Sequence, residues 1–344
     1  MNSVGIDISK GRSTIAVMRP FGEVAISPFE VRHTDSELSE LARRLKSLNG
    51  ETRVVMEATG NYHAPVAKQL HDAGLYVSVV NAKLVHGYGN NDLRRVKTDR
   101  KDAIKLANYG LDRWLTLPRY IPEENTRLLL KNCYRQYRQY SKVQTVLKNN
   151  LISLLDMTFP NANRLFNSPA RADGSEKWVD FVAEFWHCEC VSERPLKSFV
   201  NKYWRWCRKH GYNFSEEKAH AIYDEASGHI GVMPKSETTK LLVEQAVSQL
   251  SATSAALAVL KQEMQSLSSQ LPEYPVVMDM FGVGPTLGPQ LIAEIGDVRR
   301  FYSKKALVAY AGIDAPPNDS GDVIGRHKSC LLYTSPSPRD STSS

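Results

Sequence analysis

Four acidic residues stand where their types and spacing suit phosphodiester chemistry. Asp7 lies inside an apolar stretch, between two isoleucines, where an unpaired acid is costly to bury. Glu57 ends the apolar run Val-Val-Met, and α/β domains build their sites at such strand ends. Asp99 and Asp102 are three residues apart, which puts both on one face of a helix.

Such a D-E-D-D set has the chemistry to bind magnesium. Hard divalent cations prefer carboxylate oxygens, and two ions about 4 Å apart can clamp the attacking and leaving oxygens of a phosphodiester. We therefore predict that the four acids hold two Mg²⁺ ions and carry the catalysis. The spacing alone leaves open that Asp7 is a solvent-facing strand acid and that the two helix acids pair with Arg95 or Lys105.

The positive charge of the chain is concentrated in one segment. The 344 residues carry a formal charge of +7, yet residues 83–150 hold fifteen Lys or Arg and only six Asp or Glu. A local excess of this size is typical of a polyanion binder, although acidic neighbours in space could balance it. We predict nucleic-acid contacts from these side chains: Arg94, Arg95, Lys97, Arg100, Lys131, Arg135 and Arg138.

Two further patterns bear on nucleic-acid binding. Tyr134, Tyr137 and Tyr140 alternate with arginines, which suits stacking on RNA or a single strand, or else an amphipathic helix that packs its tyrosine edge. Later in the chain, Gly-Val-Gly-Pro separates two apolar helical segments, as in a helix-hairpin-helix turn that points backbone N–H groups at phosphate. We therefore predict that Gly282 and Gly284 contact nucleic acid.

The elements that must position the four acids follow from periodicity. Apolar alternation and turn signals predict three short strands within residues 3–31. A helix at 35–48, a strand at 52–57, a helix at 61–74 and a strand at 75–81 follow. Three meandering strands followed by alternating helices and strands is the order of an α/β ribonuclease H-like domain.

Long helices dominate the rest of the chain. A helix at 98–112 carries the last two acids, and residues 123–157 and 236–271 are long helical stretches, the second with a coiled-coil-like apolar repeat. We predict four parts: a metal domain at 1–122, a helical or coiled-coil region at 123–271, a small and mostly helical C-terminal domain at 272–330, and a disordered tail at 331–344.

A group of possible metal ligands lies in the middle of the chain: His187, Cys188, Cys190, Cys207 and His210. They lack the paired spacing of a zinc ribbon, and four tryptophans surround them, so we predict a packed helical core instead. The five cysteines are scattered, and the sequence shows neither a signal-peptide pattern nor an apolar window of membrane length. These features predict reduced thiols, a cytoplasmic location and no membrane partner.

Several strings of residues are recognisable together. They are VGIDISK, VVMEATGNYHAPVAKQL and VVNAKLVHGYG with RRVKTDRKDAIKLA in the first half, and MFGVGPTLGPQLIAEIGDVRRFYSKKALVAYAGIDAPPNDSG near the end. They resemble the two conserved domains of the insertion-sequence-110 transposase family, the DEDD transposases with a RuvC-like domain. The resemblance covers about residues 3–155 and 274–328, in the family's order, whereas residues 156–235 match no motif of the family.

The resemblance implies a DNA transposase or recombinase whose acidic tetrad falls on Asp7, Glu57, Asp99 and Asp102. It also implies that Ser320, in the segment NDSG, attacks DNA and forms a covalent intermediate, and that a non-coding bridge RNA pairs with donor and target DNA. Strand exchange requires several DNA strands to be held at once, which favours a dimer or tetramer. Two alternatives stay open: a metal-dependent endonuclease like a Holliday-junction resolvase, and an inactive nucleic-acid-binding remnant.

The sequence departs from the family pattern after Ser320. The family continues with a basic, glycine-containing stretch, a Leu-Arg pair and a further helix, whereas GRHKS here runs into CLLYTSPSPRD. We therefore expect an incomplete second domain and an uncertain activity for the chain as written. Nine of the last fourteen residues are Ser, Thr or Pro, so we expect residues 331–344 to be disordered, and they resemble translated adapter sequence.

Overall fold

The computed structural model describes residues 1–88, 98–312, 319–320 and 323–324. The chain divides into two compact units, Met1–Glu123 and Glu124–Ser344. The basic segment recognised in the sequence is therefore shared between the two units. None of the described helices is both long enough and apolar enough to cross a membrane.

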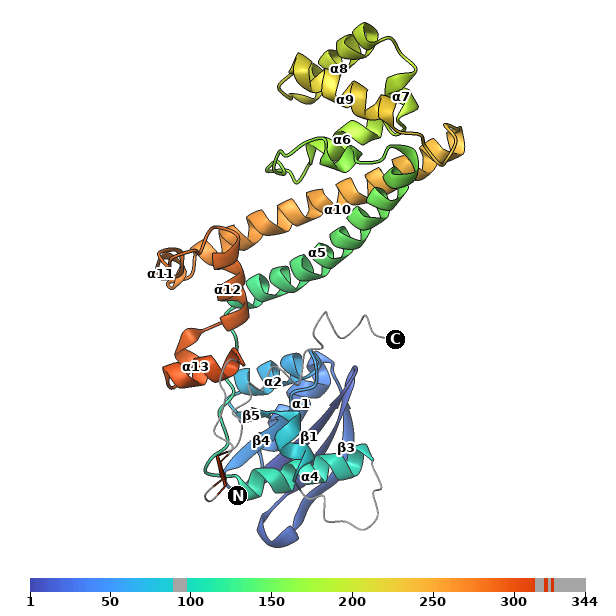
Figure 1. Ribbon diagram of the computed structural model, residues 1–344. Helices are drawn as coiled ribbons and strands as arrows, with labels where there is room; N and C mark the ends of the chain where they lie inside the picture. The colour runs from blue at the N-terminus through green and yellow to red at the C-terminus, as the bar shows by residue number, and fades with distance from the viewer. Residues whose placement is uncertain (89–97, 313–318, 321–322, 325–344) are drawn as a thin grey trace. The chain divides into compact units, whose positions relative to one another are not determined.

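The first unit is built on a five-stranded sheet in the order β3-β2-β1-β4-β5 (Figure 1). β1, β2 and β3 form an antiparallel meander, whereas β4 and β5 run parallel to β1. The strands are β1 (Asn2–Ser9), β2 (Arg12–Met18), β3 (Val24–Arg32), β4 (Thr52–Glu57) and β5 (Tyr76–Val80). This is a ribonuclease H-like sheet, so the element order predicted for the first 81 residues is confirmed.

Helices cover both faces of this sheet. The apolar stripes of α1 and α2 share one core with inward side chains of β1, β2 and β4. On the opposite face, Leu106 and Tyr109 of α4 pack with Val55 and Val80 of the sheet, and Val85 of α3 joins them. The helical elements are η1 (Pro20–Gly22), α1 (Asp35–Lys46), α2 (His63–Asp72), α3 (Ala82–His86) and α4 (Asp99–Asp112).

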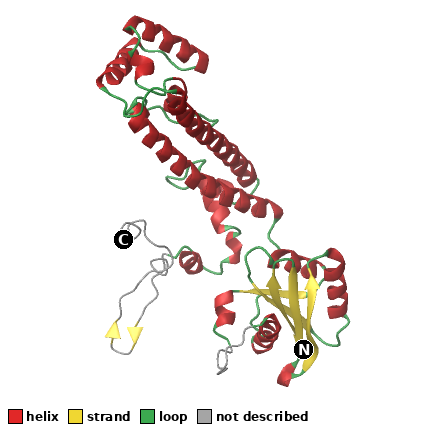
Figure 2. Cartoon of the chain, turned by 90° about the vertical axis from the view of Figure 1, so that its right-hand side faces the viewer, coloured by secondary structure: helices red, strands yellow, loops and turns green. Residues whose placement is uncertain are grey.

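The second unit is almost entirely helical in its described part (Figure 2). Two helices of 34 and 33 residues, α5 (Asn125–Thr158) and α10 (Glu237–Ser269), lie side by side. The others are η2 (Ala162–Arg164), α6 (Lys177–Glu184), α7 (Glu189–Ser192), α8 (Leu196–His210), α9 (Glu216–Gly228), α11 (Tyr274–Met278), α12 (Leu287–Ile295), η3 (Val298–Arg300), α13 (Lys304–Tyr310), β6 (Asp319–Ser320) and β7 (Val323–Ile324). The two long helices predicted from the sequence are confirmed, and their coiled-coil character stays a prediction.

Apolar clusters at both ends of the helix pair fix its direction. Near the end of α5, Leu155 packs with Val243 from the start of α10, and α6 to α9 complete an aromatic core around them. Near the start of α5, Leu130 packs with Met264 from the end of α10 and with Ile292 of α12. The two long helices are therefore antiparallel, and the aromatic core formed by α6 to α9 belongs to one end of the pair.

The packed core predicted between residues 178 and 210 is present with one correction. Trp178, Trp186 and Trp206 are buried, and the Cys207 thiol lies in the same cluster. Trp204 does not belong to this core, because 41% of its surface is exposed. It stands two residues from Trp206, which places it on nearly the opposite face of α8, at 100° per residue.

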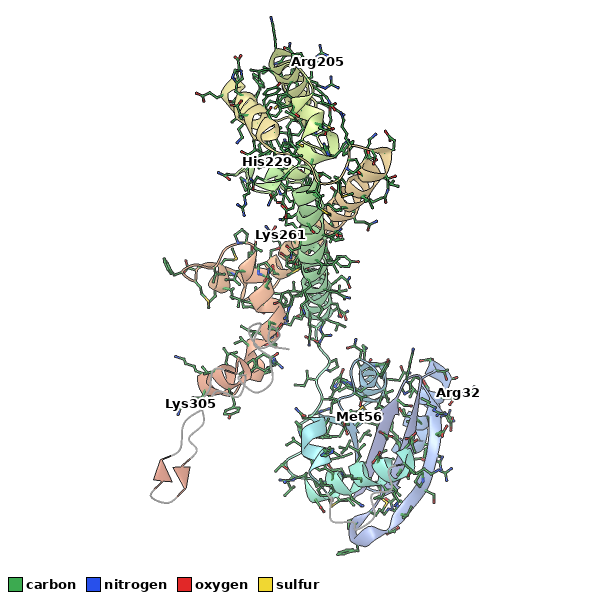
Figure 3. The ribbon with its side chains drawn as sticks, turned by 45° about the vertical axis from the view of Figure 1, so that its right-hand side comes forward. Arg32, Met56, Arg205, His229, Lys261 and Lys305 are labelled. Carbon is green, nitrogen blue, oxygen red and sulfur yellow. The ribbon has the colours of Figure 1, made fainter. Side chains whose placement is uncertain are left out.

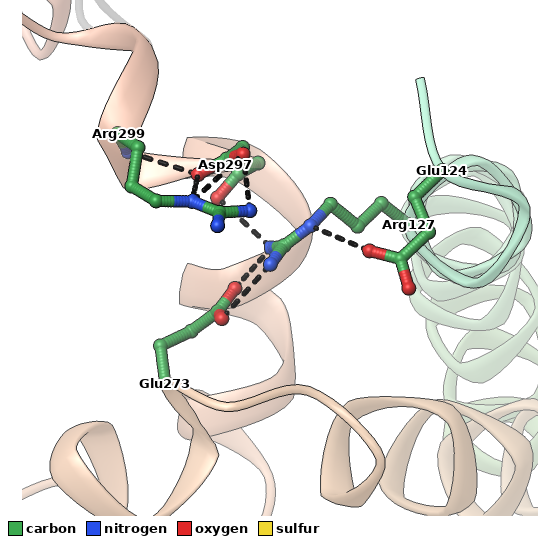
Figure 4. Close-up of polar contacts among 6 residues, drawn as sticks. Glu124, Arg127, Glu273, Asp297 and Arg299 are labelled. Carbon is green, nitrogen blue, oxygen red and sulfur yellow. Dashed lines mark hydrogen bonds and ion pairs between the residues drawn. The ribbon is translucent and has the colours of Figure 1, made fainter. Parts of the chain in front are cut away.

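A nearly buried arginine joins the start of α5 to the elements after α10 (Figure 4). The Arg127 side chain is 5% exposed and makes a two-pronged contact with Glu273, in which Nη2 donates to Oε2 at 3.0 Å. Its Nε also lies 3.3 Å from a Glu124 carboxylate oxygen. We call Glu124, Arg127, Glu273, Asp297 and Arg299 the Arg127 cluster.

The contacts of the Arg127 cluster favour the charged form of two of its acids, Glu273 and Asp297. The hydrogen bonds from Arg127 lower the pKa of Glu273 from its ordinary value. The Arg299 side chain donates to both carboxylate oxygens of Asp297 and lowers the pKa of that carboxyl to about 2. The start of α5 is thereby bound to the C-terminal elements by charge as well as by the neighbouring apolar cluster.

Candidate active site

The register of two neighbouring strands brings Asp7 and Glu57 to the same level. β1 pairs in parallel with β4, with Ile6 opposite Met56, so the next residues along these strands are Asp7 and Glu57. Ile6 and Met56 both enter the core formed with α1 and α2. Because successive side chains alternate between the faces of a sheet, the two acids point to the other face, on which α4 lies.

α4 approaches β1 closely because two positions lack a side chain. A Cβ atom at Gly5 would overlap the Ala103 carbonyl oxygen, and a Cβ atom at Gly110 would overlap the Ser3 hydroxyl. The start of α4 therefore lies over a later residue of β1 than its end does. This arrangement directs the N-terminus of α4 toward the carboxyl end of β1, where Asp7 stands.

The first turn of α4 supplies the other two acids. The Thr98 hydroxyl caps this turn by accepting a hydrogen bond from the Lys101 backbone N–H at 3.3 Å. Asp99 and Asp102 follow within the turn. Carboxylates are favoured there because the helix N-terminus carries partial positive charge.

All four acids line one cavity of about 510 Å³, which we call the tetrad cavity. Asp7 and Glu57 reach it from strand ends, and Asp99 and Asp102 reach it from the start of α4. Its other lining residues are Ile8, Thr59, Ala82, Val85, His86, Lys105 and Leu106. The structure therefore brings together the four acids that the sequence singled out.

The donor chemistry of the tetrad cavity suits a hard divalent cation. Four carboxylates offer oxygen donors, which are the ligands that Mg²⁺ prefers. Within the described residues, no group of three His, Cys, Asp or Glu side chains is already arranged to hold an ion. Since neighbouring carboxylates repel one another, a bound cation would have to draw them closer together.

Three polar side chains of the tetrad cavity were not predicted as site residues. Thr59 follows Glu57 by two positions, and Lys105 follows Asp102 by three on the same face of α4. The spacing of Lys105 from Asp102 is visible in the sequence, but spacing alone indicates only a surface ion pair. His86 ends α3, a helix of five residues that is too short to show an apolar periodicity.

Two family models match the chain on either side of its helical middle. The transposase model DEDD_Tnp_IS110 matches residues 4–160, and a model described as the transposase IS116/IS110/IS902 family matches residues 274–331. Together they cover more than half of the sequence. The chain belongs to the IS116/IS110/IS902 transposase family. The resemblance inferred from the sequence strings is thereby confirmed.

Individual relatives of this transposase are distant. An uncharacterized 44.8 kDa protein of insertion element IS116 from Streptomyces clavuligerus is 23% identical over 325 residues, covering 94% of this chain and 78% of that protein. The pilin gene-inverting protein of Moraxella bovis is 27% identical over 134 residues, covering 39% and 38% respectively. A solved structure of T. thermophilus RuvC with a Holliday junction substrate matches with TM-score 0.27 and 13% identity over 35% of this chain and 99% of that chain.

The basic residues predicted to contact nucleic acid differ in exposure where the structure of the transposase describes them. Arg100 is exposed on α4, and Arg135 and Arg138 are exposed on α5. Lys131 is half-buried on α5. The remaining ones lie outside the described residues: Arg94, Arg95 and Lys97.

Two of the three tyrosines singled out in α5 pack against the core. Tyr134 and Tyr137 lie against the apolar cluster of Leu130, Met264 and Ile292. The Arg138 guanidinium lies 5.8 Å from the centre of the Tyr134 ring, on the outer side of that contact. The structure therefore favours the interpretation of an amphipathic helix with a packed tyrosine edge.

The predicted residues of the C-terminal part are described at the level of the backbone. Gly282 and Gly284 lie in the loop between α11 and α12, and Gly282 has a φ of +78°, which favours glycine. α11 has only five residues, so the helix-hairpin-helix interpretation and its phosphate contacts stay predictions. Ser320 pairs with Val323 in the small β6–β7 sheet, and its side chain lies outside the described part.

Proposed function

We propose that this transposase cuts and rejoins DNA with the four acids of the tetrad cavity and with Ser320 as the nucleophile. The observation that carries the proposal is that Asp7, Glu57, Asp99 and Asp102 line one cavity. That cavity lies at the carboxyl ends of parallel strands, where α/β sheets bind ligands. Family membership supports the class of reaction, DNA cleavage and strand transfer.

The four acids would hold two Mg²⁺ ions, which when bound supply positive charge to the attacking and leaving oxygens of a phosphodiester. The chain itself contributes the cation of Lys105 to the cavity, and this ammonium group can contact a phosphate oxygen. The Thr59 hydroxyl and the His86 imidazole add hydrogen-bonding groups on the same lining. The cavity thus combines groups for a cation with groups for a phosphate.

In the proposed reaction, the Ser320 Oγ forms a bond to phosphorus as one P–O bond of the DNA breaks. The DNA hydroxyl that leaves takes up the proton lost by the serine. The resulting ester between protein and DNA keeps the phosphate activated for rejoining. A serine hydroxyl needs an activating base or metal and donors for the developing charge.

The nucleic-acid partners are also proposals. α5 carries six Lys or Arg and one acid, and Arg135 and Arg138 stand on its exposed side, which suits phosphate contacts. We propose that these residues bind DNA or the bridge RNA implied by the family resemblance, and that the chain acts as a dimer or tetramer. Affinity for nucleic acid should fall linearly with salt when log K is plotted against log salt concentration. Changing both arginines to alanine should make that slope shallower by about 0.7–0.9 per cation removed.

The nucleophile is tested by trapping protein on DNA. The chain is incubated with DNA carrying the element ends and Mg²⁺, denatured, and examined for DNA-linked protein. We expect an adduct that disappears in Ser320→Ala and persists in Ser248→Ala, a change at an exposed serine of α10. An adduct that survives in Ser320→Ala contradicts the proposal. Metal-dependent cutting with no adduct instead favours a resolvase-like endonuclease.

The tetrad is tested by metal binding as well as by activity. Asp102→Asn should lower Mn²⁺ affinity at least tenfold in calorimetry and abolish cutting, because it removes a charged ligand from the cavity. Asp156→Asn, at an exposed acid of α5, is the matched control and should change neither. Unchanged cutting in Asp102→Asn would remove this residue from the site.

A further inference from the structure

The outward face of α8 combines cations with an exposed tryptophan. We call Lys197, Asn201, Trp204, Arg205 and Arg208 the α8 face. They recur at three- and four-residue spacing, and all five are exposed. Figure 3 shows Arg205 in this end of the helical unit. The opposite side of the same helix carries the buried aromatic residues of the core.

The indole of Trp204 is held in place although it is exposed. The Arg208 guanidinium carbon lies 5.0 Å from the centre of the Trp204 ring, within the range of a cation–π interaction. The tryptophan keeps 41% of its surface in solvent, whereas three other tryptophans of this region are buried. An ordered, exposed indole is a large flat surface available to another molecule.

All the charged side chains of α8 are basic. The helix carries five Lys or Arg and no Asp or Glu. Lys202 pairs with Glu184 at 3.4 Å, but no carboxylate in the described part of the chain pairs with Lys197, Arg205 or Arg208. Cations in the last turn stabilise a helix through its dipole, which accounts for Arg208. The same effect disfavours Lys197 in the first turn and does not explain the exposed indole.

We propose that the α8 face binds single-stranded DNA, with phosphates on Lys197, Arg205 and Arg208 and a base stacked on Trp204. Charge complementarity selects a polyanion, and the exposed ring selects one with unpaired bases, because bases in a duplex are already stacked. The family's reaction supplies such strands wherever DNA is cut and opened. This surface lies outside the tetrad cavity and outside the residues used by the proposed function.

The test measures binding without chemistry, in EDTA, with the full chain. Fluorescence anisotropy of a labelled twenty-nucleotide oligo-dT gives affinity, and a duplex of the same length serves as comparison. Trp204→Ala should weaken oligo-dT binding about tenfold, because base–aromatic stacking is lost, and Trp204→Phe should keep most of the affinity. Arg205→Gln with Arg208→Gln should reduce the salt slope by about 0.7 per cation.

Controls separate the α8 face from charge in general. Lys261→Gln removes an exposed cation of α10 (Figure 3) and should leave affinity and salt slope nearly unchanged. Thermal unfolding checks that each variant is folded. We expect all of them to fold, because the changed side chains are exposed. Unchanged oligo-dT binding in Trp204→Ala, or an equal loss for the duplex, overturns the proposal. Binding of oligo-rU of the same length is measured in parallel. If Trp204→Ala weakens only the binding of oligo-rU, the assignment to DNA is overturned in favour of RNA.

Discussion

The tetrad cavity and the Arg127 cluster use the same residue types in opposite ways. In the cluster, three acids from distant parts of the second unit form ion pairs with two arginines. In the cavity, four acids and one lysine come together through sheet register and helix packing. In the Arg127 cluster every acid lies against an arginine side chain, which indicates a structural role. The four acids of the cavity outnumber its one lysine, which indicates a ligand site.

The largest expected effect is at the packing that forms the cavity. Gly5→Val should destabilise the first unit by more than about 3 kcal/mol, because the new side chain overlaps backbone of α4 rather than a movable side chain. Hydrogen exchange of β1 and α4 measures the loss. Gly228→Ala, at a position with open space, is the control and should have little effect. Native protection in Gly5→Val would contradict the close approach of α4 and β1.

In the Arg127 cluster, removing one charge and replacing both charges should affect the stability of the fold differently. Arg127→Ala should cost about 3 kcal/mol in urea unfolding, because Glu273 is left without its partner in a largely buried setting. Replacing both residues by methionine should recover most of that stability, since neither charge remains. A double variant as unstable as Arg127→Ala would show that the packing of the arginine, and not its charge, stabilises the Arg127 cluster.

Acid pH should reduce the contribution of the Arg127–Glu273 contact to the stability of the fold. The pKa of Glu273 is lowered in the folded chain from the ordinary 4.5, so its contact contributes fully above that value. The contribution is lost as the pH falls through the lowered folded-state pKa, because the carboxylate becomes protonated. Urea midpoints measured between pH 7 and pH 3 should therefore fall more steeply in the natural chain than in Glu273→Gln. Parallel curves would contradict this assignment.

The smallest expected effect is at the helix cap that starts α4. Thr98→Ala removes the acceptor for the Lys101 N–H and should cost about 1 kcal/mol. Thr98→Ser keeps the hydroxyl and should cost less. Urea unfolding gives the stability, and Mn²⁺ titration shows whether a frayed first turn also weakens the site carried by Asp99 and Asp102. Equal stability of all three chains would show that the cap is dispensable.

Most of the first unit was predictable because its pattern is local. Strict alternation along β1 marks Val4, Ile6 and Ile8 as core and makes Asp7 conspicuous between them. The stripe on α1, which includes Leu38 and Leu41, is equally regular. The order of such elements limits the sheet to few arrangements, so the four acids could be expected at one edge.

The remaining features depend on distance in space that no local pattern reports. Glu273 is 146 residues from Arg127, so nothing near either residue predicts their contact. His86 enters the tetrad cavity from a helix too short to show periodicity. Trp204 and Trp206 look alike in the sequence, and only the orientation of α8 against its neighbours determines which one is buried.

The antiparallel pair of α5 and α10 has a consequence for spacing. A helix of 34 residues at 1.5 Å per residue separates its ends by about 50 Å. The aromatic core with α8 lies at one end and the Arg127 cluster at the other, so the pair acts as a ruler within the second unit. On B-form DNA this length corresponds to about 15 base pairs, at 3.4 Å each. Removing seven residues from each helix would shorten the ruler by about 10 Å, or three base pairs, while leaving both ends intact.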